Sequence, residues 1–523
     1  MARINTNVPS LIARSHLAKS SAELEVRLQR LSTGVRLNRG ADDPAGLIIS
    51  ERLRSDIRGA EQGIKNAERA SSVIATTESA LAEINELLNS IRSLLVEAAS
   101  PGAFSKEQVK ANQLQIDSAI DSITRISNTA TFGGLKLLNG QLDYNVSGIV
   151  AGDIAQAKVF GASFIGAPNI AVDVQVVASA QTGGLFLRGD LPTPGSPLNG
   201  TVLSTTTLRI AGSRGVTEIS VVSGRTLDDI ITAVNRLSSS TGVRAERINT
   251  TDVSSGIVFR STAYGSDAFV SVDRVGGPPD LANDWFRTYS LVDDAAVPGS
   301  VPFPWGLIGT TLTVDNHDTG RDVTALVNGT IATGSGLNVS VNGPTLSLEL
   351  LLNETFGTMP GGVVSTFHIT GGGALFQLGP EVNAQQQANI GVASMAASTL
   401  GGVLINGNLQ FLSSLKSGQT NSLDASADRK DFSQASDILQ KAIDEVSILR
   451  GRLGAFERNV LETNVRSLQA SFENLTASSS RIRDADFAQE TSELTRSQIL
   501  TNAGTTVLAL ANAQSQNVLQ LLG

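Results

Sequence analysis

Apolar residues in the first part of the chain repeat at the spacing of a helix. Leu17, Leu24 and Leu31 recur every seven residues, and Leu28 and Val35 are offset from them by four. This spacing places one apolar seam along a helix. The chain is therefore predicted to open with an amphipathic helix whose apolar side needs a partner.

A second, longer helix is predicted after the stretch 39–46, where Gly, Asp and Pro combine to end one helix and start another. Its apolar positions step alternately by three and four residues up to about Ser100, which is typical of a coiled coil. A third helix is predicted to begin with a capping box from Ser105 to Gln108 and to end near Asn128. The seam positions of the second helix are Leu53, Ile57, Ala60, Ile64, Ala67, Ile74, Thr77, Leu81, Ile84, Leu88, Ile91, Leu95 and Ala98.

The middle of the chain, about 143–372, is rich in Gly, Val, Thr and Ser and has short alternating segments typical of strands. A helix is predicted to start at Thr226. We interpret this part as one or two β-rich domains, with a joint near 275–300 where prolines gather. Hairpins are predicted at the Asn-Gly pairs 199–200, 328–329 and 342–343.

The last part, about 373–523, returns to helical spacing. One heptad register runs from Ala442 to Val460, and a second register begins one residue later at Leu461. The final segment is also predicted to present apolar seams. Its apolar residues share two heptad positions, Leu500, Val507 and Leu521 in one, and Ala511 and Val518 in the other.

Helical seams at both chain ends thus enclose a β-rich middle. Because each terminal helix alone would leave its seam exposed, the simplest arrangement packs the N- and C-terminal helices on each other. The expected fold class is α+β multidomain, a terminal α-helical coiled-coil hairpin with a β-rich middle insertion; three unrelated domains are the alternative. The expected parts are a terminal helix at 1–42, a helical rod at 43–142, β-rich outer domains at 143–372, the returning rod at 373–480 and a second terminal helix at 481–523.

Composition narrows the function classes. The formal net charge is −9, so a general nucleic-acid binder is not expected. The aromatic fraction of 4% suits slender coiled coils, and the absence of cysteine excludes disulfides and cysteine-ligated zinc. The first twenty residues lack the apolar stretch of a secretory signal, and no run approaches the roughly 18 apolar residues of a membrane span. We therefore expect no membrane insertion and no cleaved signal.

No residues combine into a recognisable catalytic or metal site. The histidines are His16, His317 and His368, and a three-histidine metal site would need all of them. The segment 315–322 resembles a calcium loop at its first and sixth positions, but Leu326 stands where a bidentate glutamate is required. Phosphate-binding and hydrolase motifs are missing. We expect a solvated turn at 315–322, no cofactor, no metal and no enzyme activity.

Several motifs occur in the order found in one known family. At the front they are Ile4-Asn-Thr-Asn7, Leu31-Ser-Thr-Gly-Val-Arg-Leu-Asn38, Asp42-Asp-Pro-Ala-Gly46 and Thr131-Phe-Gly-Gly-Leu-Lys-Leu-Leu-Asn139. At the back they are Leu449-Arg-Gly-Arg-Leu-Gly-Ala-Phe456, Asn474-Leu-Thr-Ala477, Ser480-Arg-Ile-Arg-Asp-Ala-Asp486, Gln498-Ile-Leu500 and Asn517-Val-Leu-Gln-Leu-Leu522. Both ends resemble those of bacterial flagellins, and the segments 208–213, 226–231 and 256–260 resemble a small repeat of flagellins and hook-associated proteins.

The resemblance implies a hairpin-shaped subunit that polymerises into the bacterial flagellar filament for swimming motility. Paired terminal helices would form the filament core, a helical rod would make most axial contacts, and the β-rich insertion would face outward. The implied partners are further copies of the chain, an export chaperone at the C-terminal helices, and the flagellar cap and hook-associated proteins. Family members are exported unfolded through the flagellar machine, so the expected location is the extracellular filament.

Two candidate sites accompany this interpretation. Polymerisation is expected to use the terminal seams at Leu17, Leu24, Leu28, Leu31, Val35, Leu500, Val507, Ala511, Val518 and Leu521. The resemblance also implies an innate-receptor patch at Ile91, Arg92, Leu94 and Val96. Strongly signalling members usually carry arginine where this chain has Ser90 and glutamate where it has Ser122, so weak or absent receptor activation is predicted.

Three other functions stay open. A flagellar hook–filament junction protein has related ends but forms a short ring, so open-ended polymerisation would discriminate. A surface adhesin or glycan-binding module on helical stalks belongs to a different class. An enzyme inserted into the middle is the third, and the missing cysteines and metal motifs speak against it. The match of 517–522 to flagellin tails favours a filament subunit.

Overall fold

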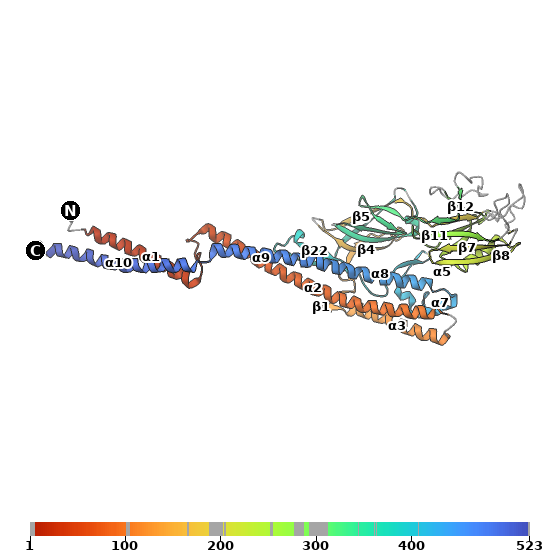
Figure 1. Ribbon diagram of the computed structural model, residues 1–523, viewed down its shortest axis with the longest axis horizontal. Coiled ribbons are helices and arrows are strands. Elements are labelled where there is room, and N and C mark those ends of the chain that lie inside the picture. Colours follow the sequence, from red (N-terminus) through yellow and green to blue (C-terminus); the bar gives the residue numbers. More distant parts are fainter. Residues whose placement is uncertain are drawn as a thin grey trace. The chain divides into compact units, whose positions relative to one another are not determined.

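The computed structural model (Figure 1) divides into two units, each with its own internal contacts. The terminal unit comprises Met1–Ala70, Gln377–Gln387 and Arg458–Gly523, and the body unit comprises Ser71–Phe376 and Ala388–Glu457. The structure describes residues 6–100, 105–164, 167–187, 202, 205–250, 255–276, 287–291, 312–343, 345–359, 361, 363–405 and 407–520, with side chains up to 514.

The terminal unit is helical. Its first helix α1 (Val8–Thr33) packs along the last helix α10 (Phe487–Gln520), as the seams at the two chain ends predict. The first part of the long helix α2 (Pro44–Ala98), helix α9 (Glu462–Arg483) and the short 3-10 helix η2 (Ala384–Gln386) complete this unit. The predicted pairing of the chain ends is therefore confirmed.

Local signals define where α1 starts and stops. Asn7 caps its start, because the side-chain oxygen accepts a hydrogen bond from the Ser10 amide at 3.1 Å. Gly34 ends the helix in the left-handed region, with φ of 69°, and its amide donates to the Arg30 carbonyl. The placement of Val35 in the helical seam was wrong, since the chain has already left the helix and Val35 forms an antiparallel bridge with Asp484.

The segment 377–387 lies on the helices of the terminal unit, and two polar side chains hold it there. Asn66 donates to the Gln377 carbonyl at 3.1 Å, and Asn464 donates to the Leu378 carbonyl at 2.8 Å. A Cβ on Gly63 would lie 2.9 Å from the Leu378 carbonyl oxygen. The absence of a side chain at Gly63 therefore permits this close approach.

The body unit is built on a helical rod. It contains the rest of α2, together with α3 (Lys106–Thr129), α7 (Leu423–Arg429) and α8 (Ser433–Phe456). The reciprocal Ser105–Gln108 capping box opens α3 as predicted. The predicted heptads form the rod core: the buried residues include Ile74, Leu81, Ile84, Leu88, Ile91, Leu95, Ile116, Ile120, Ile123, Ala442, Val446, Leu449 and Leu453.

The return to helix comes later in the chain than predicted. From 374 to 415, besides the 3-10 helix η2, the described chain forms short strands and a second 3-10 helix, and α-helix resumes only at Leu423. Repeated glycines and the polar stretch 416–422 explain the delay, because they carry no helical periodicity. These short elements are β21 (Ala374–Gln377), β22 (Gln387–Ile390), β23 (Val403–Ile405), β24 (Asn408–Gln410) and η3 (Leu412–Leu415), while β1 (Thr131–Phe132) and β2 (Leu135–Lys136) follow α3.

A π-helical turn, η4 (Glu457–Leu461), joins α8 to α9. A π turn holds one more residue than an α turn. It lies where the sequence shifts from the register ending at Val460 to the register beginning at Leu461. The extra residue is thus absorbed without breaking the helix, and both registers keep apolar residues on buried positions such as Leu453 and Leu468.

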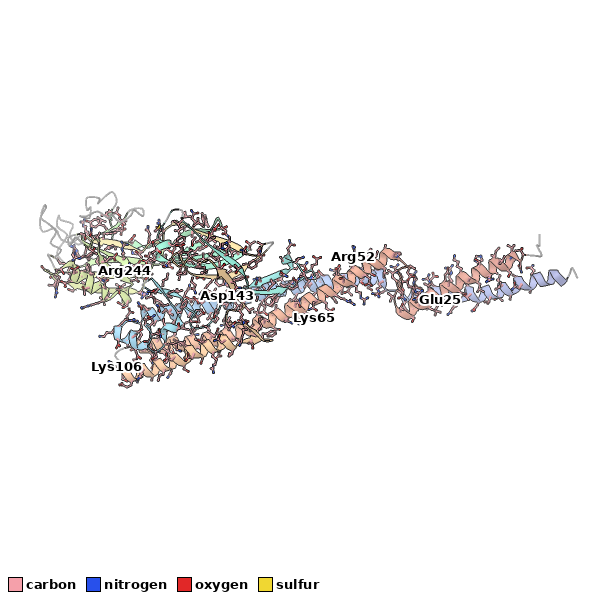
Figure 2. The ribbon with its side chains drawn as sticks, turned by 180° about the vertical axis from the view of Figure 1, so that it is seen from behind. Glu25, Arg52, Lys65, Lys106, Asp143 and Arg244 are labelled. Carbon is pink, nitrogen blue, oxygen red and sulfur yellow. The ribbon has the colours of Figure 1, made fainter. Side chains whose placement is uncertain are left out.

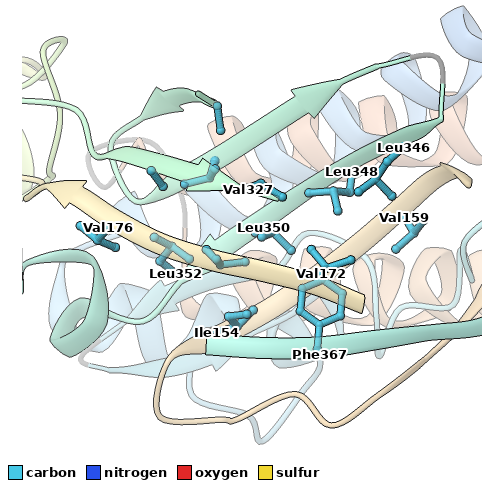
Figure 3. Packing of buried hydrophobic residues seen from close by; sticks show 14 of the residues in the cluster. Ile154, Val159, Val172, Val176, Val327, Leu346, Leu348, Leu350, Leu352 and Phe367 are labelled. Carbon is cyan, nitrogen blue, oxygen red and sulfur yellow. The ribbon is translucent and has the colours of Figure 1, made fainter. Parts of the chain in front are cut away.

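The first β lobe comprises residues 144–178 and 324–372. Its two sheets enclose a core to which Val172, Leu350 and Phe367 contribute (Figure 3). One sheet has the order β16-β15-β5-β20-β3, the other β17-β18-β19-β4. The strands are β3 (Tyr144–Ser147), β4 (Ile154–Ala162), β5 (Ile170–Ala178), β15 (Thr324–Val327), β16 (Thr330–Ile331), β17 (Thr333–Ser335), β18 (Asn338–Asn342), β19 (Leu346–Leu352) and β20 (Val364–Gly372), with the short helix α6 (Glu354–Gly357).

The inserted β lobe comprises residues 184–319. Its sheets have the orders β13-β12-β6-β10-β9 and β14-β11-β7-β8, and α4 (Leu227–Asn235) packs into the core between them. The predicted helix start at Thr226 is confirmed by its capping box with Asp229. The remaining elements are β6 (Gly184–Leu187), β7 (Thr206–Gly212), β8 (Gly215–Val221), α5 (Ser238–Thr241), β9 (Val243–Arg247), β10 (Ile257–Ser261), β11 (Phe269–Val275), β12 (Thr288–Leu291), β13 (Leu312–Val314) and β14 (His317–Thr319).

The inserted lobe interrupts the first lobe at one point. The chain leaves the first lobe after Gln181 and returns to it at Arg321. These two residues exchange backbone hydrogen bonds of 2.8 and 3.0 Å. The joint predicted near 275–300 falls largely outside the described residues, and the crossing that the structure describes is at 181 and 321 instead. Hairpins are confirmed at 328–329 and 342–343; the pair 199–200 lies outside the described residues.

Candidate assembly site on the paired chain ends

The contact between α1 and α10 follows a heptad on each helix. Leu17 packs on Gly504, where an added Cβ would lie 3.2 Å from a Leu17 methyl group. Small or polar residues occupy many of the other positions, so the two backbones approach closely. The buried and half-buried positions recur at Ser10, Ala13, Leu17, Ser20, Leu24, Arg27 and Leu31 on α1, and at Glu490, Leu494, Ser497, Thr501, Gly504, Leu508 and Ala511 on α10.

Polar contacts fix the register of the pair toward the chain termini. The Asn7 amide nitrogen donates to the Ala511 carbonyl at 3.1 Å, while the same side chain caps α1. Ser10 donates to the Asn512 side chain at 2.7 Å. A one-residue slip would break both contacts together, so they specify one alignment.

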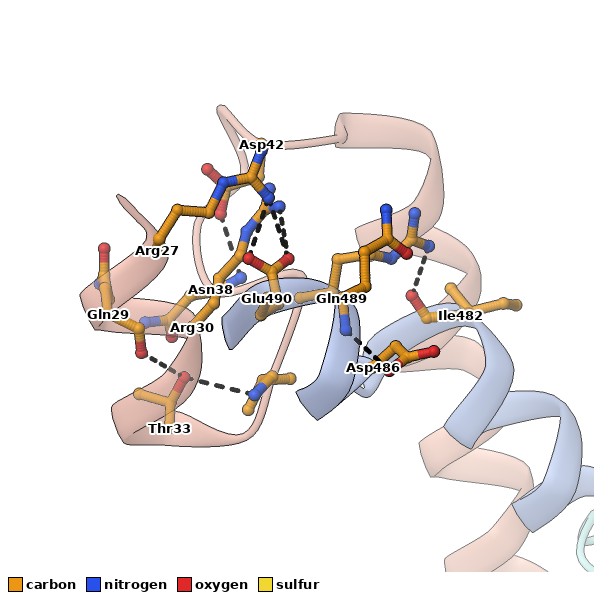
Figure 4. Close-up of polar contacts among 12 residues, drawn as sticks. Arg27, Gln29, Arg30, Thr33, Asn38, Asp42, Ile482, Asp486, Gln489 and Glu490 are labelled. Atoms are coloured by element: carbon orange, nitrogen blue, oxygen red, sulfur yellow. Dashed lines mark hydrogen bonds and ion pairs between the residues drawn. The ribbon is translucent and has the colours of Figure 1, made fainter. Parts of the chain in front are cut away.

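At the other end of the pair, two arginines of α1 surround one carboxylate of α10 (Figure 4). Arg27 lies 2.9 Å and Arg30 lies 3.2 Å from the nearest Glu490 oxygen. Burial raises the pKa of Glu490, but the hydrogen bonds and charges of Arg27 and Arg30 outweigh burial and hold the pKa below its usual value. Glu490 is only 4% exposed, so its carboxylate is largely shielded from solvent. The sequence analysis missed this cluster, although charges at seam positions of both helices could have indicated it.

Backbone hydrogen bonds join the segment after α1 to the segment before α10, just beyond this cluster. The Arg36 amide donates to the Arg483 carbonyl at 2.7 Å, and the Ala485 amide donates to the Gly34 carbonyl at 3.0 Å. The Arg36 guanidinium adds a 2.7 Å bond to the Ile482 carbonyl. The end of α1 and the start of α10 are therefore joined as a short antiparallel bridge.

Apolar side chains lie uncovered on the outer surfaces of the pair. On α10, Ile499, Leu500, Val507 and Leu510 are 44–70% exposed and fall on one flank of the helix. A shallow hollow on this flank is lined by Ser492, Thr495, Arg496, Ile499 and Leu500. On α1, Val8, Leu11, Ile12 and Val26 are 39–56% exposed. Within the described residues nothing packs over these side chains.

The seam residues taken from the sequence separate into two groups. Leu17, Leu24, Leu31 and Ala511 lie in the contact between the helices. Leu28, Leu500 and Val507 are 44–55% exposed and lie outside that contact, so their role in polymerisation stays a prediction. Ser497, Thr501, Gly504 and Leu508 occupy the seam instead. The side chains of Val518 and Leu521 lie outside the described residues.

The residues of the implied receptor patch lie on α2 in the rod. Ile91 is fully buried as a heptad core residue, so it is not part of an accessible patch. Arg92 and Ser90 are exposed, Val96 is 65% exposed, and Leu94 and Ser122 are half-buried. Accessible side chains of the patch are thus limited to Arg92, Leu94 and Val96.

The candidate chemistry in the sequence forms no metal site in the described part of the chain. The segment 315–322 contributes strand β14 and a turn. There Asp318 accepts a 2.6 Å hydrogen bond from the Gly184 amide, and Asn316 donates to Asp273 at 2.6 Å. Burial raises the pKa of Asp318. Every helix among the described residues is too short or too polar to cross a bilayer.

Paired amphipathic chain ends with uncovered apolar flanks, carrying a β-rich insertion, define a structural subunit of a polymer. Residues 4–143 match the bacterial flagellin N-terminal helical region, residues 436–522 the bacterial flagellin C-terminal helical region, and residues 207–263 the flagellin hook IN motif. The chain belongs to the bacterial flagellin family, and it is a structural subunit of the extracellular flagellar filament.

Several curated relatives align along the whole chain. The flagellin of Salmonella muenchen is 28% identical over 543 residues, and the B-type flagellin of Pseudomonas aeruginosa is 29% identical over 526 residues. Both alignments cover 99% of each chain. Nothing in these comparisons favours the hook–filament junction alternative.

Solved structures give weaker matches. The D1-D2-D3 domains of the flagellar cap protein from Escherichia coli align with a TM-score of 0.25 and 15% identity, over 57% of this chain and 64% of that chain. FlgL from Xanthomonas campestris aligns with a TM-score of 0.26 and 11% identity, over 82% of this chain and 99% of that chain. Overlaps this small support no statement about function.

Proposed function

We propose that the subunit polymerises through the uncovered apolar flank of α10 at Ile499, Leu500, Val507 and Leu510, together with the exposed apolar residues of α1. The exposure of these side chains carries the proposal. Burying one Leu or Ile fully is worth about 1.5–3 kcal/mol, so several together provide a substantial drive for association. A contact that repeats head to tail without closing produces a filament.

The test compares substitutions on the two flanks of α10. Leu510→Asp would place a charge in the buried contact, and we expect it to raise the critical concentration for polymerisation at least about tenfold, the effect of about 1.4 kcal/mol. Gln498→Asp is the matched control, because Gln498 is an exposed polar residue on the opposite flank. The critical concentrations of both variants are measured from seeded growth, followed by light scattering and electron microscopy.

Equal polymerisation of Leu510→Asp and the parent chain would reject the apolar flank as a contact. Removal of residues 1–40 and 490–523 provides a second comparison, since it deletes both members of the helix pair. Monomers or short closed rings from the intact chain would instead favour the junction-protein alternative.

The proposal extends to the organisation and partners of the subunit. The terminal helices at 1–42 and 481–523 serve as the filament core, the segments 43–142 and 373–480 as the rod, and 143–372 as outer domains. An export chaperone binds the C-terminal helices, and cap and hook-associated proteins contact the filament. Export proceeds without a cleaved signal, the subunit has no catalytic activity, and the buried Ile91 together with Ser90 and Ser122 predicts weak or absent receptor activation.

A further inference from the structure

A polar cleft of about 650 Å³ opens in the body unit, lined by the two β lobes, strand β23 and the start of α8. The inserted lobe contributes Arg244, labelled in Figure 2, and Asp267. The first lobe contributes Asn338, and α8 contributes Gln434. This volume falls within the range of about 300–1,000 Å³ that is usual for ligand sites, and domain interfaces are a common place for them.

Three internal contacts hold the walls of the cleft. Arg214 of the inserted lobe pairs with Asp437 of α8 at 2.5 Å, and Tyr264 donates a short hydrogen bond to Glu354 of the first lobe. Asp322 accepts hydrogen bonds from the Ser266 hydroxyl at 2.6 Å and from the Gly336 amide at 2.7 Å. Each contact joins two different parts of the unit, so the cleft is a built feature.

The titration of these wall residues is altered by their surroundings. Burial and the hydrogen bond to Glu354 raise the pKa of Tyr264. Burial also raises the pKa of Asp437, against the opposing effect of Arg214. Burial acts to raise the pKa of Asp322, but the bonds from Ser266 and Gly336 outweigh it and lower the pKa. Altered ionisable groups gathered in one cleft are typical of binding sites.

A second set of polar side chains lines the cleft without partners of its own. The side chains of Arg244, Asp267, Asn338 and Gln434 make no hydrogen bond or ion pair with any described residue. They include a cationic donor, an anionic acceptor and two amides that both donate and accept. These are the groups left to bind a ligand.

The charges and shape of the lining restrict the ligand. Five carboxylates and two guanidinium groups line the cleft, so a polyanion would be repelled. Hydrogen-bonding groups predominate, but Tyr264, Leu337 and Leu404 supply some apolar surface for C–H groups. We propose that this cleft binds a neutral oligosaccharide of two or three sugar units, whose hydroxyl groups both donate and accept.

The test uses full-length protein and saturation-transfer NMR with maltotriose and N,N′,N″-triacetylchitotriose as neutral probes. At least one neutral probe should bind, and Arg244→Ala and Asp267→Ala should each weaken it about tenfold, the usual effect of losing a hydrogen bond to a charged group. Arg236→Ala is the matched control, because Arg236 is exposed on the same lobe and does not line the cleft. Trigalacturonate, an anionic trisaccharide, should bind at least about tenfold more weakly than the neutral probe.

Absence of binding by both neutral probes at about 10 mM would overturn the proposal. Binding that both cleft substitutions leave unchanged would also overturn it, and so would equal or tighter binding of trigalacturonate. Circular dichroism of each variant confirms that the lobes remain folded. Because the cleft is remote in sequence from the terminal helices, failure here leaves the assembly proposal unaffected, and the reverse also holds.

Discussion

At the scale of single residues, Glu490 has the clearest effect on the helix pair. It carries a charge at a seam position, where a carboxylate is costly to bury, and Arg27 and Arg30 offset that cost. The sequence predicted Leu17, Leu24 and Leu31 in this seam correctly, because leucine fits its geometry. Leu500 and Val507, also predicted as seam candidates, lie on an apolar flank of α10 beside a seam of small and polar residues. Spacing alone does not say which of these two surfaces faces α1.

Glu490→Gln should weaken the pairing of α1 and α10 by about 1–3 kcal/mol, since two guanidinium groups lose their charged acceptor. The lowered pKa of Glu490 adds a pH dependence. The stabilisation is present above its ordinary pKa of 4.5 and is lost as the pH falls through the lowered value in the folded protein. Acid-induced filament disassembly followed by light scattering measures both effects.

The glutamine variant should fall apart at a less acidic pH than the parent filament. Glu25→Gln is the matched control, because it removes the charge of an exposed carboxylate on α1 that lies outside the Arg27–Arg30–Glu490 cluster. Identical acid profiles for Glu490→Gln and the parent would show that the cluster does not stabilise the pair.

At the scale of elements, heptad spacing located the long helices and their buried faces. The one-residue shift between Val460 and Leu461 coincides with the π turn η4, although the shift was not interpreted as a turn of that kind. Elements without such spacing were missed. The short strands and the two 3-10 helices between 374 and 415 depend on tertiary contacts, so local sequence did not separate them from the helical rod.

Deletion of Asn459 should convert η4 into an ordinary α turn, because it removes the extra residue and brings the two registers into one. We expect the stability of the body unit to stay within about 1 kcal/mol of the parent, as the heptad core is retained. Thermal unfolding by circular dichroism measures this. Deletion of Ile443 within α8 is the contrasting control, since it rotates the buried face and should destabilise the rod strongly. Equal losses from both deletions would contradict the assignment of η4 as a register insertion.

At the scale of the whole chain, the sequence predicted the order of helical ends and β-rich middle, but not the nesting of one lobe inside the other. The β strands pair across long separations, such as β5 with β15, and no local signal specifies such partners. The cleft was missed for the same reason, since its lining comes from separate stretches of sequence. The fold class could be predicted from hydrophobic periodicity alone. The strand pairing within the lobes could be determined only from the three-dimensional structure.

Deletion of residues 183–319 should leave the first β lobe folded. Gln181 and Arg321 form a hydrogen-bonded pair, so Thr182 and Gly320 would become a two-residue hairpin turn, and Thr182→Asn would give the favoured Asn-Gly sequence. We expect the shortened chain to polymerise and to lose oligosaccharide binding in the cleft. Electron microscopy and the NMR assay measure these results. A chain that aggregates or fails to form filaments would show that the inserted lobe is required for folding.

The meeting of the two chain crossings at Gln181 and Arg321 also bears on how such a protein can diversify. Any segment that replaces 183–319 has to satisfy one geometric condition. Its two ends must lie as close together as the hydrogen-bonded residues Gln181 and Arg321. The residues of the inserted lobe and the residues of the α1–α10 contact therefore lie in separate stretches of the coding sequence. A change within 183–319 can alter the inserted lobe without altering any residue of the helix pair.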